Sequence, residues 1–279
     1  MVVYKKYGET FKKLRKQRGF KLTSFEHLGI SSAALCKFEK GNSLLKFDRL
    51  ILALEELSIT LSEYEKCLND YELDDHELLI QKLIMATVKG DLKEVSELYN
   101  EATVIREQYL ALAVKGVYSN LTQEEKEELV DYFERIKFWR YTDLYTFYLS
   151  LSWLELSEIS FVIEGFFTAN TEVFNSLEHR NRVTHIICYA VMIFISKGYV
   201  TKSEFLLSKV LCENYKHTMF TKNAVNFVKG FWESEFGKKE QGIQSMKDAL
   251  NNFELLSIPG ISSYYKRLYE KYSNSPCIL

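Results

Sequence analysis

The sequence has 279 residues, of which 47% are hydrophobic and 14% aromatic, so it can form a sizeable core and wholesale disorder is excluded. It contains only 2 prolines and 12 glycines. β-Sandwiches and barrels need many turns rich in these residues, so the composition indicates a mostly helical protein. At roughly 100–200 residues per domain, the length indicates two domains.

The charge is distributed unevenly along the chain. Residues 1–50 hold 12 Lys/Arg against 4 Asp/Glu, a balance of +8, and the remainder holds 24 against 34, a balance of −10. A basic segment ahead of an acidic body indicates a nucleic acid or another anionic partner for the basic part. The alternative is a solvated, lysine-rich helix.

The five cysteines have no CxxC spacing, and the chain turns charged at Lys5 and Lys6 without a signal-peptide pattern. The longest apolar run, 183–195, is shorter than the ~20 residues that a membrane span needs. We therefore expect a cytoplasmic protein with reduced thiols and no membrane partner.

Residues 1–70 show five short segments with helical spacing of apolar residues, near 7–17, 23–28, 33–39, 50–57 and 60–68. Gly19 and Gly29 are placed to end the first two, and Ser31 or Ser32 to cap the third. A tight glycine turn between the second and third short helices predicts a helix-turn-helix domain.

This region resembles the Xre-type DNA-binding domain in LRKQRG (14–19), LCKFEKG (35–41) and the stretch 50–64. The resemblance implies that Arg15 and Glu39 pair as part of the scaffold and that the third helix faces DNA. That helix offers small residues at its start, which cannot make the bidentate hydrogen bonds that read G or A. They can contact thymine methyls or leave specificity to DNA shape.

The candidate DNA contacts are of two kinds. The basic residues are expected to contact phosphates: Lys12, Lys13, Lys16, Lys37, Lys40 and Lys46. The small residues lie near base edges: Thr23, Ser31, Ser32, Ala33 and Ala34. A degenerate head without DNA binding is the alternative, against which the +8 balance argues, because phosphate contacts require charge.

Residues 71–279 show turn signals near Gly90, Asn120, Ser157, Gly198 and Gly237, about 30 to 41 residues apart. Two helices per interval predict a tetratricopeptide-like right-handed superhelix of helix pairs. With Gly237 at the turn, the three positions where the repeat has small residues hold Gly230, Gly242 and Ala249, and the position where it has a large residue holds Met246. A generic helical array without a true repeat is the alternative.

A short Xre-type head on such a body resembles the Rgg family of regulators, cytosolic receptors for peptide pheromones in quorum sensing. CKFEKG (36–41), FVKGF (227–231) and MKDA (246–249) carry the resemblance. It implies a homodimer, held in part near 257–272, that binds double-stranded DNA, and a concave groove that binds a short hydrophobic peptide. Some members use a cysteine to link the two heads and an arginine to hold the peptide; Phe47 and Tyr145 occupy these positions here.

In tetratricopeptide-like units, the first helix of each pair lines the concave face. The register above places nine candidates there: Phe147, Leu151, Arg182, His185, Met192, Asn223, Phe227, Phe231 and Ser234. The apolar members are expected to form a pocket for peptide side chains. The polar ones are expected to satisfy the peptide backbone and its terminal carboxylate. The alternative is that these side chains pack on one another and close the groove.

No GxGxxG, P-loop, HExxH, GxSxG or EF-hand pattern occurs, and no nucleophile, base and orienting group come together. We therefore expect no enzyme activity, no cofactor and no metal. The sequence predicts an all-α regulator with a DNA-binding domain at 1–70 and a ligand-binding and dimerisation domain at 71–279. The alternative is a protein-interaction adaptor whose head no longer reads DNA.

Overall fold

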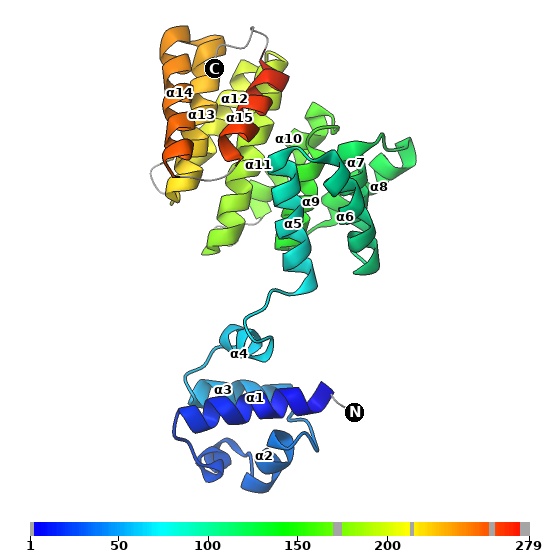
Figure 1. The fold of residues 1–279 in the computed structure, drawn as a ribbon, viewed down its shortest axis with the longest axis vertical. Helices are drawn as coiled ribbons and strands as arrows, with labels where there is room; N and C mark the ends of the chain where they lie inside the picture. Colours follow the sequence, from blue (N-terminus) through cyan, green and yellow to red (C-terminus); the bar gives the residue numbers. More distant parts are fainter. Residues whose placement is uncertain (1–2, 170–174, 213–214, 257–259, 274–279) are drawn as a thin grey trace. The chain divides into compact units, whose positions relative to one another are not determined.

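The computed structural model describes residues 3–169, 175–212, 215–256 and 260–273, and within these ranges helices joined by turns and loops are found, without a strand. The chain divides into two compact units, Met1–Asp75 and His76–Leu279. The boundary expected after residue 70 falls in the connection between the last helix of the first unit and the first helix of the second (Figure 1).

The first unit contains five short helices. They are α1 (Val3–Gln17), the 3₁₀ helix η1 (Leu22–Leu28), α2 (Ser32–Glu39), α3 (Phe47–Glu56) and α4 (Leu61–Leu68). Its core is aromatic: the Phe11 ring lies 5.8 Å from the rings of both Phe25 and Phe38. Gly8 allows α1 and α2 to touch, since a Cβ there would come within 1.8 Å of the Phe38 carbonyl oxygen.

The helix-turn-helix consists of η1, the turn at Gly29 and α2. Gly29 has a φ of 72°, a left-handed conformation that glycine adopts without strain. The Ser31 hydroxyl caps α2 by accepting a hydrogen bond from the Ala34 amide at 3.2 Å. Two bounds differ from the prediction: α1 begins at Val3 and α3 at Phe47, because no residue there breaks the helix and Lys46 has the extended conformation of an N-cap.

The second unit is an array of helix pairs followed by one more helix. The pairs are α5 (Asp75–Lys89) with α6 (Leu92–Val104), α7 (Gln108–Tyr118) with α8 (Gln123–Arg135), α9 (Tyr141–Ser150) with α10 (Leu156–Ala169), α11 (Leu177–Ser196) with α12 (Val200–Leu211), and α13 (Met219–Phe236) with α14 (Lys239–Leu255); α15 (Ile261–Tyr272) follows.

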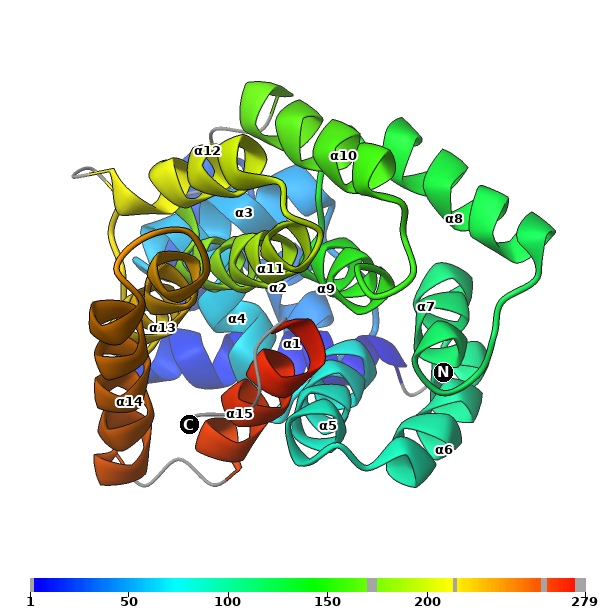
Figure 2. The ribbon, with the colours of Figure 1, turned by 90° about the horizontal axis from the view of Figure 1, so that it is seen from above.

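The first pair packs on the second through α6 and α7, and the later pairs pack through their first helices, since α7 contacts α9, α9 contacts α11, and α11 contacts α13. Figure 2 shows these first helices on the inside of the curve, with α8, α10 and α12 on the outside. The prediction of an all-α chain, with a helix-turn-helix unit followed by a tetratricopeptide-like array, is confirmed. In the described parts of the chain, no helix is both long and apolar enough to span a membrane.

The last pair explains why the repeat pattern requires small residues. A Cβ on Gly230 would come within 2.8 Å of the Gly242 carbonyl oxygen, and one on Gly242 would come within 2.4 Å of the Ser234 amide nitrogen. The backbones of α13 and α14 therefore lie in direct contact at this point.

Helix α15 turns back over the concave side. Its Tyr265 and Tyr269 rings pack 5.1 and 5.3 Å from Phe227 and Phe231 of α13. Arg267 donates a hydrogen bond to the Val88 carbonyl of α5, so the last helix of the array meets the first, as Figure 2 also shows. In the segment 257–272, which was expected to take part in the dimer, the apolar face of α15 is therefore buried within the same chain. Residues 257–259 of this segment lie outside the described residues.

Candidate functional site

A buried ion pair in the first unit fixes the position of α2. Arg15 Nε lies 2.5 Å from Glu39 Oε1, and Nη2 lies 2.9 Å from Oε2. Arg15 Nη1 also donates to the Phe20 carbonyl at 2.6 Å. Only 8% and 5% of the two side chains are exposed. The pair predicted from the sequence is present, and its bidentate geometry holds the end of α2 against α1.

Most of the candidate DNA contacts are exposed on the first unit, and three are half-buried: Lys12, Ser32 and Ala34. Thr23, Ser31 and Ala33 are exposed, and so are all the candidate lysines except Lys12. Ser32 is less available than expected, because its hydroxyl donates to the Glu26 carboxylate. The sequence reasoning missed Arg49, which donates to the Leu28 carbonyl and ties α3 to the turn.

The second unit holds a cavity of about 90 Å³ on its concave side. Five helices contribute to its wall: Ile84, Thr87 and Val88 of α5, Tyr145 and Tyr148 of α9, Arg182 and His185 of α11, Phe220 of α13, and Ile261, Tyr264 and Tyr265 of α15. Arg182 and His185 come together as the sequence analysis predicted. The contributions of α5 and α15 were not foreseen.

Arg182 dominates the electrostatics of this cavity. Its guanidinium lies 4.6, 5.3 and 5.6 Å from the ring centres of Tyr145, Tyr148 and Tyr141, within the range of cation–π interactions. Burial, with a further contribution from the Arg182 charge, lowers the pKa of His185 to about 3, so the imidazole is neutral at physiological pH. Burial also raises the pKa of Tyr148 to about 12. The cavity therefore has one positive charge among neutral groups.

Several predicted groove residues are engaged within the chain instead. Met192, Phe227 and Phe231 are fully buried, the two phenylalanines beneath the α15 tyrosines. Asn223 Nδ2 donates to the Ala249 carbonyl at 2.7 Å, and the Ser234 hydroxyl donates to the Phe231 carbonyl at 2.8 Å. At these five positions the structure matches the alternative in which the side chains pack on one another and close the groove. Helix α15 fills the space that an open groove would leave there.

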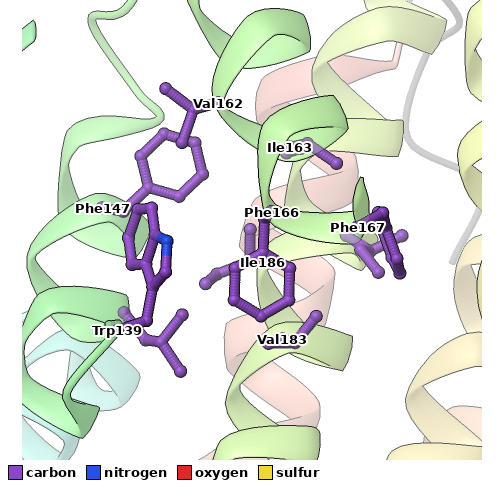
Figure 3. A pocket seen from close by; sticks show the side chains of 10 residues that line it. Trp139, Phe147, Val162, Ile163, Phe166, Phe167, Val183 and Ile186 are labelled. Atoms are coloured by element: carbon purple, nitrogen blue, oxygen red, sulfur yellow. The ribbon is translucent and has the colours of Figure 1, made fainter. Parts of the chain in front are cut away.

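Phe147 and Leu151 are also buried, and Phe147 faces away from the concave cavity. Figure 3 shows Phe147 with Trp139 and residues of α10 and α11 around a separate, wholly apolar cavity of about 10 Å³. The predicted register on α9 is thus displaced, since Tyr145 and Tyr148 face the concave side. One residue turns a helix by about 100°, so a small register error selects the wrong face. The spacing of Tyr141, Tyr145 and Tyr148 was the signal that could have corrected it.

Among the described residues, no group of three His, Cys, Asp or Glu side chains is arranged to hold a metal ion. The molecule has a helix-turn-helix unit with exposed lysines and an array of helix pairs with a cationic cavity on its concave side. These features define a helix-turn-helix protein with a small cationic cavity in its helical body.

Residues 65–267 match the family model described as the HTH-type transcriptional regulator Rgg, C-terminal domain, and the chain therefore belongs to the Rgg family. Its fold is similar to that of the SHP pheromone receptor Rgg2 of Streptococcus dysgalactiae (TM-score 0.76, 19% identity, covering 96% of this chain and 100% of that one). A putative transcriptional regulator from Listeria monocytogenes EGD-e has a TM-score of 0.78 and 18% identity over 96% and 98% of the two chains. ComR from S. thermophilus, in complex with DNA and its signalling peptide ComS, has a TM-score of 0.58 and 16% identity over 94% and 97%.

Proposed function

We propose that this Rgg-family regulator binds double-stranded DNA through its first unit, as a cytoplasmic homodimer, and that a short peptide in the concave cavity controls it. The observation that supports the peptide is the small cavity on the concave side, which is lined by residues of five helices and has a mostly apolar wall. ComR, whose structure holds both DNA and a signalling peptide, supports the combination of partners. No catalytic role is assigned to any residue.

DNA binding is tested by the salt dependence of affinity for duplex DNA. Because Lys37 and Lys40 are exposed on and next to α2, replacing both with alanine should weaken binding to all sequences. It should also flatten the slope of log affinity against log salt by about 0.9 for each phosphate that is no longer neutralised. Lys66→Ala, on α4, is the matched control and should leave the slope unchanged. Unchanged affinity in the double variant would favour the adaptor function instead.

The homodimer is tested by light scattering at micromolar concentration in reductant, where a monomer would contradict the proposal. Two heads related by a two-fold axis should occupy half-sites about one helical turn, ~34 Å, or a multiple of it, apart. Peptide control is tested by measuring DNA occupancy with and without the peptide fraction of a culture medium. If no peptide fraction changes the DNA occupancy, the protein would be a peptide-independent regulator whose groove is filled by its own side chains.

A further inference from the structure

Glu26 places an exposed carboxylate at the point of the helix-turn-helix where α2 begins. It lies on η1, and its carboxylate accepts a hydrogen bond from the Ser32 hydroxyl. Ser32 is the first residue of α2, so this bond holds the carboxylate at the start of the second helix of the motif. The ion pairs in the described part of the first unit join other residues, such as His27 with Glu56.

A carboxylate at this place is unexpected in a basic DNA-binding unit. When a helix-turn-helix protein binds DNA, the second helix of the motif lies in the major groove with its N-terminal residues against base edges. Residues 1–50 carry a charge balance of +8, which suits phosphates, whereas phosphates repel a carboxylate. The Ser32 hydroxyl occupies only one of the roughly four acceptor positions of the carboxylate. A contact with a hydrogen-bond donor on a base would use the others and would compensate the repulsion.

The other side chains at this end of α2 are less suited to reading a base. Ala33 and Ala34 have no polar side-chain atom, and the Ser31 hydroxyl accepts a hydrogen bond from the Ala34 amide. Because it is charged, the Glu26 carboxylate forms stronger hydrogen bonds than a serine hydroxyl does. In the major groove cytosine presents the N4 amino donor, whereas adenine presents its N6 donor next to the N7 acceptor, which repels a carboxylate. A group that only accepts therefore fits cytosine best.

We propose that Glu26 reads a cytosine in the major groove by accepting a hydrogen bond from its N4 amino group. Ser32 is a positioning residue, because its hydroxyl orients the carboxylate. The proposal rests on the proposed function, DNA binding through the first unit, and names a base that this unit recognises. In the homodimer the contact should occur once in each half-site.

The base contact is tested by selecting duplexes from a pool of random sequence with the full-length protein and its variants. The parent should enrich sites with a cytosine at a position where Glu26→Gln selects adenine, because a glutamine amide matches the donor and acceptor of adenine. Glu26→Ala should have no preference at this position. Glu56→Gln is the matched control, since Glu56 lies 3.4 Å from His27 of the same helix η1, and it should select the parent's sites.

The outcomes of the selection separate this contact from DNA binding itself. If both Glu26 variants select the same sites as the parent, Glu26 reads no base and the proposal is wrong. A parent protein that enriches no sequence would contradict the DNA-binding function, and the cytosine contact with it.

Affinities for single duplexes distinguish base reading from damage to the fold. Replacing the C·G pair by T·A in the selected site should weaken binding by the parent about 5- to 150-fold, the range for one mismatched base pair, while Glu26→Ala should bind both duplexes alike. Glu26→Ala should bind an unrelated duplex at least as tightly as the parent, because a carboxylate near phosphates has been removed. An equal loss of affinity for all three duplexes would overturn the proposal, since the carboxylate would then act on the fold.

The role of Ser32 is tested with the same duplexes. Ser32→Ala should discriminate less between the C·G and T·A sites than the parent does, and Ser32→Thr, which keeps a hydroxyl, should restore the discrimination. Discrimination in Ser32→Ala equal to that of the parent would show that the hydroxyl does not position the carboxylate.

Discussion

Two buried arginines show how the same side chain serves different purposes. Arg15 is satisfied by the Glu39 carboxylate and the Phe20 carbonyl, and so it holds the first unit together. Arg182 instead lies against the rings of Tyr145 and Tyr148, and its guanidinium donates to the Tyr141 hydroxyl. A carboxylate therefore compensates one buried charge, and aromatic rings surround the other.

Glu39→Gln should destabilise the first unit by about 3–5 kcal/mol, because it leaves the Arg15 charge buried and unpaired. The three tryptophans lie at 139, 153 and 232, outside this unit, so hydrogen exchange of α1 and α2 amides is the suitable measurement. Glu9→Gln removes the exposed Lys5–Glu9 pair, whose side chains are 63% and 50% exposed, and should cost under about 1 kcal/mol. Equal protection losses in the two variants would contradict this reasoning.

His185 should make the second unit sensitive to acid. Its pKa is about 3 in the folded chain and 6.5 ordinarily. Between these values the unfolded chain binds a proton that the native chain does not. The free energy of unfolding should therefore fall as the pH drops below 6.5, by up to about 1.4 kcal/mol per pH unit. Tryptophan fluorescence during urea unfolding measures this, and His185→Phe should show a shallower pH dependence than the parent. Parallel curves for the two proteins would argue against a buried neutral imidazole.

At the scale of helices, periodicity predicted that each element is helical but not always which face is buried. On α11 the register gave Arg182 and His185 correctly, since both line the cavity. On α9 the register placed Phe147 on the concave face, but Phe147 instead packs against Trp139 at the small apolar cavity. Helix α9 is buried nearly all round, so its sequence carries little contrast between faces and the repeat register alone had to decide.

Gly242→Ala should destabilise the second unit by about 1–3 kcal/mol, because a methyl group there would collide with the backbone of α13. Gly165→Ala is the matched control on α10. A Cβ at Gly165 has no atom within 4 Å, so the substitution should stabilise the helix by about 0.5–1 kcal/mol. Urea unfolding followed by tryptophan fluorescence compares the two. Effects of the same sign would show that helix propensity, not backbone contact, governs both positions.

At the scale of the whole molecule, the features that could be predicted from the sequence are those that depend on residues close together in the chain. The helical class, the helix-turn-helix and the Arg15–Glu39 pair follow from spacing, from glycine turns and from the Xre resemblance, all within short stretches. The wall of the concave cavity does not follow from such patterns, because it depends on α15 returning to α5 across the whole array. Two hydrogen bonds, from Arg267 to the Val88 carbonyl and between the Tyr148 and Tyr264 hydroxyls, join residues that are far apart in the sequence. The local spacing of apolar residues does not predict that such residues lie close together. That return also explains why the groove predicted to be open is filled at Phe227 and Phe231.

Chymotrypsin should cut the native chain first after Tyr71. The residues between α4 and α5 connect the two compact units. Tyr71, in this connection, is 75% exposed and has a backbone φ of 62°, a value that residues other than glycine rarely adopt. Each unit has its own hydrophobic core, so two folded fragments should persist after cleavage. Mass spectrometry of a time course identifies the first cut, and Tyr71→Ala should delay it. Early cleavage inside either unit, or rapid disappearance of one fragment, would show that the two units do not fold independently.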